Sequence, residues 1–136
     1  MNEIASYPSL NNKVTVITGG ASGIGENLVE HFIIQKSKVA FLDIEEKLGN
    51  ELVNKIEKKY KLRPLFVKCN LKNIKELQNS IKKIKETLGP IHTLVNNAAN
   101  DDRHDFDSVT PEYWDDRMNI NLKHYFFATQ AVYKDM

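Results

Sequence analysis

The stretch Thr18-Gly19-Gly20-Ala21-Ser22-Gly23-Ile24-Gly25 decides the fold, because it joins a predicted strand to a predicted helix. Residues 13–18 before it read K-V-T-V-I-T, a β-branched run that favours a strand. Residues 24–35 after it form a helix whose apolar stripe is Ile24, Leu28 and Phe32. A glycine-rich turn in this position is typical of a phosphate-binding loop, although ordinary turns use glycine too.

Strands and helices alternate along the rest of the chain. The further strands are expected at 38–42, 64–68 and 91–95, and the further helices at 45–60, at 74–88 and from Thr110 onward. Gly89-Pro90 ends the third helix, and Thr110-Pro111 begins the last one as N-cap and first turn. This alternation predicts an α/β fold with a doubly wound parallel sheet, with four strands in the order 3-2-1-4 and four helices.

The last helix carries apolar residues on more than one side. One stripe is expected to hold Trp114, Met118, Leu122 and Tyr125, and further apolar positions are Phe126, Phe127 and Val132. A helix that is apolar on two sides needs two partners. The sheet is one, and a further element or another subunit is the other.

Composition excludes several classes of protein. Apolar residues make up 41% of the 136 residues and the net charge is +1, which argues against disorder. Residues 36–85 carry fourteen bases and six acids, but without interleaved aromatic residues they predict polar helix faces rather than a nucleic-acid interface. No apolar run is long enough for a membrane span. The single cysteine, Cys69, is expected to be a buried, inert thiol, and we expect a cytoplasmic protein.

The acid at the end of the second strand points to a cofactor. Asp43 lies eighteen residues after Gly25, where a carboxylate can accept hydrogen bonds from an adenosine ribose. It would repel a 2′-phosphate, and no arginine stands at Ser22 or Ile44, so NAD is favoured over NADP. The alternative role for Asp43 is to cap the helix that begins near Glu45, and the two roles are compatible.

These motifs together resemble the short-chain dehydrogenase/reductase family. The resemblance rests on residues 18–25, Asp43, Asn96-Asn97-Ala98-Ala99 and Asn121, and it runs from about Tyr7 to Met136. Residues 96–104 and 110–132 resemble NAD-dependent sugar dehydrogenases of that family, including those that oxidise D-xylose and other aldoses to the lactone. The resemblance implies a Rossmann domain, an NAD cofactor, a sugar or polyol substrate and a homo-oligomer.

The resemblance also implies roles for individual residues. The residues implied to bind NAD are Gly19, Ser22, Gly23, Ile24, Gly25, Asp43, Ile44, Asn70, Leu71, Asn97 and Ala98. Asn70 stands where the family usually has an aspartate beside the adenine; its amide oxygen can still accept a hydrogen bond there. Asn121 is implied to be catalytic: it would kink the last helix and hold a water that passes protons to a catalytic lysine.

The family's catalytic Ser and Tyr-x-x-x-Lys are not found in this sequence, and Tyr133-Lys134 has the wrong spacing to replace them. We therefore expect residues 1–136 to be the N-terminal part of a single NAD-binding Rossmann domain that ends within the last helix. Strand 91–95 would then be an apolar edge. The complete form would be the oxidoreductase, and the alternative is a non-catalytic NAD-binding module.

A polar cluster follows the fourth strand, where ligands of open α/β sheets bind. The residues expected to contact a sugar are Asp101, Asp102, Arg103 and His104. The alternative is a solvated polar loop. A metal site is not expected, because the possible ligands are consecutive in sequence. His124, in the last helix, is expected at the surface or partly buried.

Overall fold

The computed structural model of the protein describes residues 5–136. Its centre is a sheet of four parallel strands in the order β3-β2-β1-β4. The strands are β1 (Val14–Thr18), β2 (Lys38–Asp43), β3 (Leu65–Lys68) and β4 (Ile91–Val95). The predicted doubly wound sheet and its strand order are confirmed.

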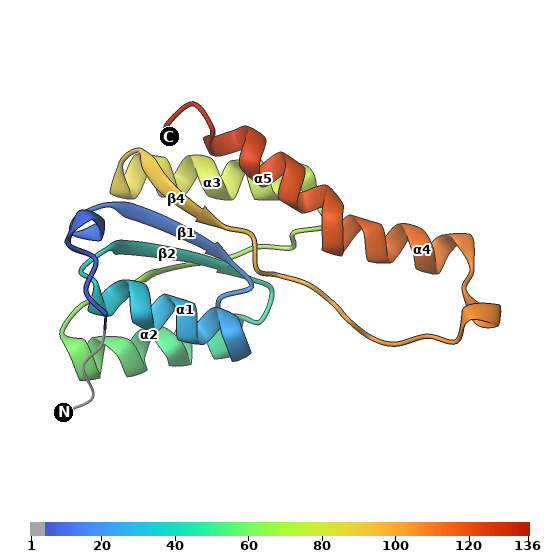
Figure 1. The fold of residues 1–136 in the computed structure, drawn as a ribbon, viewed down its shortest axis with the longest axis horizontal. Coiled ribbons are helices and arrows are strands. Elements are labelled where there is room, and N and C mark those ends of the chain that lie inside the picture. Colours follow the sequence, from blue (N-terminus) through green and yellow to red (C-terminus); the bar gives the residue numbers. More distant parts are fainter. Residues whose placement is uncertain (1–4) are drawn as a thin grey trace.

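Helices cover both faces of the sheet, as predicted. They are α1 (Gly23–Ile34), α2 (Glu46–Tyr60), α3 (Ile74–Leu88), α4 (Pro111–Met118) and α5 (His124–Val132). Figure 1 shows α1 and α2 against one face and α3 and α5 against the other, whereas α4 projects beyond the sheet. A π-helical turn, η3 (Asn119–Lys123), joins α4 to α5, so the three segments form the fourth predicted helix. Short 3₁₀ helices, η1 (Pro8–Leu10) and η2 (Phe106–Ser108), complete the described elements.

The strands are apolar on both sides because each face of the sheet has its own core. Successive strand residues point to opposite faces. In β2, Ala40 and Leu42 join the core under α3 and α5, whereas Val39 and Phe41 join the core under α1 and α2. The helices are therefore fixed above and below the sheet, and the carboxyl ends of the strands stay open for a ligand.

The predicted helix ends are confirmed where a specific residue marks them. The Asn73 side chain accepts a hydrogen bond from Glu76 N–H at the start of α3, and Gly89 ends that helix with φ +97°. The Thr110 side chain accepts from Tyr113 N–H at the start of α4. These caps satisfy backbone groups that the helix itself cannot pair.

The buried stripe of α1 differs from the predicted one. The structure buries Gly25, Val29 and Ile33, whereas Ile24 is 75% exposed and borders open space. The reason is the close approach of α1 to the turn before it: a Cβ on Gly25 would lie 1.8 Å from Gly19 O. Helix α1 therefore packs against the turn through Gly25, and its buried stripe lies one residue later than predicted.

The last helical run also departs from the predicted stripe. Trp114 and Leu122 are exposed, and the buried residues of α5 are His124, Ala128 and Val132. A π-helical turn holds one more residue than an α-turn, so the face presented to the sheet changes after η3. The expectation of a surface or partly buried His124 is wrong, because its side chain is fully buried.

The chain after α5 is anchored to α3 and β4. Helix α5 ends at Val132, so the prediction that helix continues to the last residue is wrong. The Asp135 carboxylate accepts hydrogen bonds from Ile91 N–H at 3.1 Å and pairs with Lys85 Nζ at 2.9 Å. Strand β4 is the sheet edge beside β1; its Ile91 is buried and its other apolar residues are half-buried. Within residues 5–136, no helix combines the length and apolar character that a membrane crossing requires.

Candidate functional site

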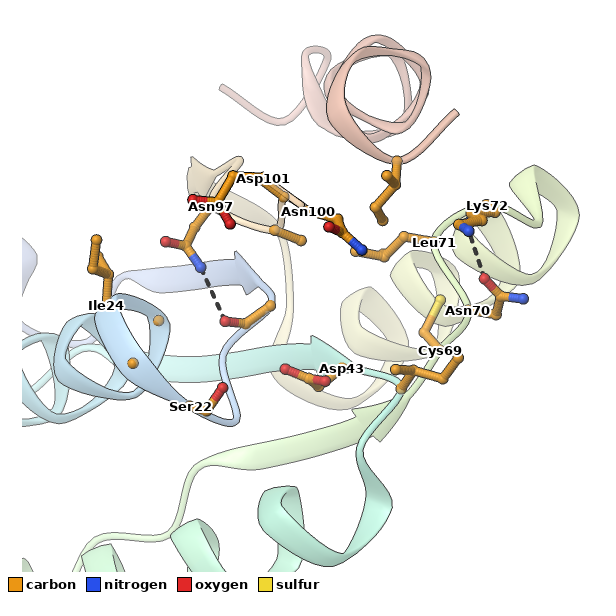
Figure 2. Close-up of a pocket in the computed structure, with 17 residues that line it drawn as sticks. Ser22, Ile24, Asp43, Cys69, Asn70, Leu71, Lys72, Asn97, Asn100 and Asp101 are labelled. Carbon is orange, nitrogen blue, oxygen red and sulfur yellow. Dashed lines mark hydrogen bonds between the residues drawn. The ribbon is translucent and has the colours of Figure 1, made fainter. Parts of the chain in front are cut away.

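A cleft of about 660 Å³ lies at the carboxyl ends of the strands. Figure 2 shows side chains entering it from the turn after β1, from the ends of β2 and β3, and from the loop after β4. The predicted cofactor residues that line it are Gly19, Ser22, Gly23, Ile24, Gly25, Asp43, Ile44, Asn70, Leu71, Asn97 and Ala98. The structure thus brings together all eleven positions, which come from four separate segments of the chain.

The glycine turn forms one wall of this cleft. Gly19 has φ +66°, and its N–H donates a hydrogen bond to Leu42 O at 2.7 Å. This hydrogen bond links the turn to β2. Gly23 has φ +57°, and no atom lies within 4 Å of the place where its Cβ would be. The start of α1 therefore faces open space that a ligand can fill.

The first turn of α1 supplies hydrogen-bond donors to that space. The Glu26 N–H is the first to bond within the helix, to Ser22 O at 3.2 Å, so the N–H groups of residues 23–25 have no helical partner. The Ser22 side chain makes no capping hydrogen bond. Free donors at the positive end of a helix dipole bind anions such as pyrophosphate.

Asp43 holds two backbone segments at once. Its Oδ2 accepts from Ala21 N–H at 2.9 Å, and its Oδ1 accepts from Glu45 N–H at 3.0 Å. Asp43 thus orders the turn and the chain before α2. The alternative role as helix cap is wrong, because the N-cap of α2 is Glu45 and no side chain caps that helix; Asp43 binds the N–H of Glu45 instead. Each carboxylate oxygen keeps a second lone pair, so the residue can still accept hydrogen bonds from a ligand in the cleft.

Asn70 is also partly engaged. Its Oδ1 accepts from Lys72 N–H at 3.1 Å, as Figure 2 shows, and its own N–H donates to Glu76 Oε1 at 2.8 Å. The amide oxygen expected to face an adenine therefore already has one partner. The departure from aspartate leaves one lone pair and the NH₂ group for a ligand.

The loop after β4, residues 96–110, forms the opposite wall and is tied to the glycine turn. The Asn97 Nδ2 donates to Thr18 O at 3.0 Å and to Gly19 O at 2.9 Å. The Thr18 hydroxyl accepts from the N–H groups of Asn97 and Ala98 at 3.0 and 3.1 Å. A Cβ on Gly19 would lie 2.8 Å from Ala98 Cα, so the two walls touch.

Asn121 lies behind this loop, in η3, and does not line the cleft. Its Oδ1 accepts from Asn100 N–H at 2.7 Å, and its Nδ2 donates to Asn100 O at 2.9 Å. These reciprocal hydrogen bonds join the loop to the π-helical turn. The Asn121 side chain is therefore connected to the cleft through Asn100, which lines it.

The polar cluster predicted to contact substrate is divided. Asp101 lines the cleft, whereas Asp102, Arg103 and His104 do not. The His104 ring stacks on Tyr113 with a centroid distance of 4.1 Å, and Tyr113 OH donates to Asp102 O at 2.9 Å. Of the four residues, Asp101 alone is placed for a ligand. Residues 5–136 contain no cluster of three or more His, Cys, Asp or Glu suited to a metal ion.

Sequence reasoning missed five lining residues, which are Cys69, Lys72, Ala99, Asn100 and Ile120. Four of them adjoin predicted positions in sequence, so adjacency could have found them; Ile120 follows only from the π-helical turn. Cys69 is buried as expected, and burial raises the pKa of its thiol to about 11, so it stays protonated at neutral pH. Lys72 Nζ donates to Asp116 Oδ1, and this contact lowers the pKa of the Asp116 carboxyl.

Comparison with known proteins shows which family the chain matches. The model of the short chain dehydrogenase family matches residues 13–136. The D-xylose 1-dehydrogenase of Caulobacter vibrioides is 44% identical over 128 residues, which are 94% of this chain and 50% of the relative. A probable galactose dehydrogenase of Rhizobium meliloti is 38% identical over the same shares of the two chains. The chain thus spans about half the length of the curated relatives it matches.

A solved structure has the same fold over nearly all of the chain. A blue fluorescent protein from a metagenomic library, in complex with NADPH, superposes with a TM-score of 0.87 at 28% identity. The match covers 93% of this chain and 52% of that protein.

Proposed function

The chain belongs to the short-chain dehydrogenase family, and we propose that residues 1–136 form the NAD-binding part of a single Rossmann domain in a sugar-oxidising enzyme. The observation that carries the proposal is the convergence of four sequence segments on one cleft beside the free start of α1. The unobstructed space at Gly23 and the free donors of the first helical turn suit a pyrophosphate.

The chemistry of the lining assigns a part of the cofactor to each segment. The turn at Ser22, Gly23 and Ile24 would hold the pyrophosphate, and Asp43 would accept hydrogen bonds from the adenosine ribose. The adenine would lie between Ile44 and the Asn70–Leu71 segment. The nicotinamide half would then run along Asn97 and Ala98, toward Asp101. The cofactor supplies the hydride acceptor when it is bound.

Charge favours NAD over NADP. The lining contains the acids Asp43 and Asp101 and one cation, Lys72, whose ammonium group is engaged with Asp116. A 2′-phosphate next to Asp43 would meet a carboxylate and no arginine. This is the physical basis for proposing NAD, although the related metagenomic protein is complexed with NADPH.

A sugar or polyol is the proposed substrate. The matched relatives include D-xylose, galactose and galactitol dehydrogenases. The Asp101 carboxylate at the cleft can accept hydrogen bonds from sugar hydroxyls. No Tyr-x-x-x-Lys occurs among the 136 residues, so this chain offers no such base to remove the hydroxyl proton. A missing general base costs about 10²- to 10⁴-fold in rate, so we expect the chain alone to be inactive.

The second candidate is a non-catalytic NAD-binding module, which the same cleft supports. It predicts the same cofactor binding and differs in the enzyme assay. If the 136 residues joined to a segment bearing Ser and Tyr-x-x-x-Lys oxidise D-xylose or D-galactose, the enzyme proposal holds. If the joined protein binds NAD and oxidises no sugar or polyol, the module proposal replaces it.

Calorimetric titration with NAD and NADP tests the cofactor. We expect NAD to bind with a Kd of roughly 1 µM to 1 mM, the range in which enzyme KM values usually fall, and NADP to bind at least about tenfold more weakly. Ile44→Arg places a cation beside the proposed ribose position and should improve NADP binding by about tenfold through one charge-assisted contact. Leu48→Arg, on the exposed side of α2, is the matched control and should change neither affinity. Equal binding of NAD and NADP by the unaltered chain would overturn the NAD assignment.

Two further features are proposed for the complete protein. The exposed apolar side chains Trp114, Leu122 and Phe126 along α4, η3 and α5 support assembly into a homo-oligomer. The single buried thiol, Cys69, supports a reducing, cytoplasmic location.

A further inference from the structure

A buried hydroxyl joins the two walls of the cleft. The Thr18 side chain is fully buried at the end of β1, and its Oγ1 accepts two hydrogen bonds, from Asn97 N–H and Ala98 N–H. A hydroxyl oxygen has two lone pairs and one proton. Both lone pairs are therefore occupied, and the proton must find an acceptor, because an unpaired buried donor is costly.

Two acceptors lie at the same distance from this proton's oxygen. Val95 O in β4 is 3.5 Å from Thr18 Oγ1, and His124 Nε2 in α5 is also 3.5 Å away. The backbone carbonyl belongs to the sheet, whereas the imidazole reaches the hydroxyl from a helix 106 residues later in the chain. The choice between them decides whether α5 controls the position of Thr18.

The imidazole is suited to accept. The His124 side chain is fully buried, and burial lowers the pKa of the ring, which the neighbouring Ile120 carbonyl offsets only in part. The ring is therefore neutral at physiological pH and carries one proton. With that proton on Nδ1, which makes no hydrogen bond within residues 5–136, Nε2 is free to accept from the Thr18 hydroxyl.

The π-helical turn explains why a histidine stands at this point. His124 is the first residue of α5, directly after η3, and it shares a buried stripe with Ala128 and Val132. The extra residue in η3 changes the phase of the helix, which turns position 124 toward the sheet. The same turn carries Asn121, which makes two hydrogen bonds to the backbone of Asn100, so η3 also holds the loop after β4 at that residue.

We propose that His124 is a positioning residue for the cofactor: its Nε2 accepts the Thr18 hydroxyl and thereby fixes the cluster of Thr18, Asn97 and Ala98 along the cleft. This inference rests on the proposed function for its ligand, NAD. It assigns the role to the nicotinamide half of the cleft, because Asn97 and Ala98 lie there, whereas Asp43 and Asn70 form the adenosine half.

The two halves of the cleft allow a discriminating test with NAD and AMP as probes. His124→Leu removes the acceptor and keeps an apolar side chain; it should weaken NAD binding by about tenfold, the effect of one lost hydrogen bond. AMP, which occupies the adenosine half only, should keep its affinity. His124→Gln restores an acceptor near the position of Nε2 and should recover most of the NAD affinity. His31→Leu, at an exposed histidine of α1, is the control and should change neither ligand.

Three results would overturn the proposal. Unchanged NAD binding by His124→Leu would mean that Val95 O takes the Thr18 proton. An equal loss of NAD and AMP binding would mean that the substitution only destabilises the fold. A glutamine variant no better than the leucine variant would mean that the acceptor is irrelevant.

Two measurements without ligand keep this test separate from the cofactor proposal. In the unaltered chain, nitrogen NMR should find Nδ1 of His124 protonated and Nε2 unprotonated; a proton on Nε2 would overturn the proposal. Hydrogen exchange at the Asn97 and Ala98 amides should be about tenfold faster in His124→Leu, with exchange at Ile17 in β1 unchanged. If the unaltered chain binds no NAD, the cofactor proposal fails, and these measurements still decide whether His124 holds Thr18.

Discussion

Two backbone hydrogen bonds, from the N–H groups of Gly19 and Gly20 to Leu42 O, link the glycine turn to β2. The loop after β4 is held mainly by side-chain hydrogen bonds. Asn97 ties that loop to the turn, and Asn121 ties it to the π-helical turn. Both walls line the same cleft. The turn is thus held by backbone hydrogen bonds to β2, by the Asp43 carboxylate and by the close contacts of its glycines, whereas the loop depends on the side-chain amides of Asn97 and Asn121.

This comparison predicts how each wall fails when a residue is changed. A side chain added at Gly19, Gly20 or Gly25 introduces atoms where none fit, so it should disturb the whole fold. A substitution in the loop removes a hydrogen bond, so it should release one segment and leave the sheet intact.

The largest effect is expected from Gly25→Ala. Its Cβ would lie 1.8 Å from Gly19 O, so α1 must move away from the turn. We expect a loss of about 3 kcal/mol in the free energy of unfolding, as for overpacked cores, together with loss of NAD binding. Urea denaturation and calorimetry measure the two effects.

Gly89→Ala is the control for this change. Gly89 has φ +97° and ψ −167°, but no atom lies within 4 Å of its Cβ position, and it is remote from the cleft. The variant should lose about 2 kcal/mol from backbone strain and retain full NAD affinity. If Gly25→Ala keeps its affinity as well, the turn is not the cofactor wall.

The next effect is expected from Asn121→Ala, which breaks both reciprocal bonds to Asn100. We expect a loss of about 2 kcal/mol and faster hydrogen exchange confined to residues 96–104. Asn119→Ala, in the same π-helical turn, removes a side-chain amide that makes no hydrogen bond within residues 5–136 and should stay within about 0.5 kcal/mol of the parent. Uniformly faster exchange across the sheet would show that loop and sheet unfold together.

The third effect is a loss of stability at acidic pH that depends on His124. The pKa of His124 is lowered from its usual 6.5 by burial, so the unfolded chain binds a proton more readily than the folded chain. Stability from this residue is fully present above pH 6.5 and falls as the pH drops below that value. His124→Gln should flatten this part of the stability profile between pH 6.5 and 5. An unchanged slope would contradict the buried neutral imidazole.

The smallest effect separates the two parts of the polar cluster. His104→Ala removes an exposed ring outside the cleft and should change stability by less than about 0.5 kcal/mol. It should leave NAD affinity unchanged. In the complete protein, Asp101→Asn should raise the KM for sugar, and His104→Ala should not. The reverse result would move the substrate to the Tyr113 side of the loop.

The same contrast explains what the sequence could predict. The strand, turn and helix around residues 18–25 follow from local patterns, and Asp43 follows from its place at the end of the next strand. The burial of His124 depends on one extra residue in a helical turn, for which the apolar spacing gives no signal. Asp101 lines the cleft and His104 does not, because the His104 ring stacks on Tyr113. The position of the Lys72 ammonium group depends on its contact with Asp116. Both are contacts between separate segments, which the sequence pattern does not reveal.

The most direct test of the account is an NMR titration of the chain with NAD, because the amide signals report which residues meet the ligand. The account predicts that NAD shifts the amides of residues 19–25, 43–44 and 97–101. A second cleft of about 660 Å³ lies at the opposite end of the strands, beside the start of β2, and its lining includes Lys36, Lys38, Lys61 and Arg63. Shifts confined to that basic cleft, or no shifts at millimolar NAD, would contradict the proposed cofactor site.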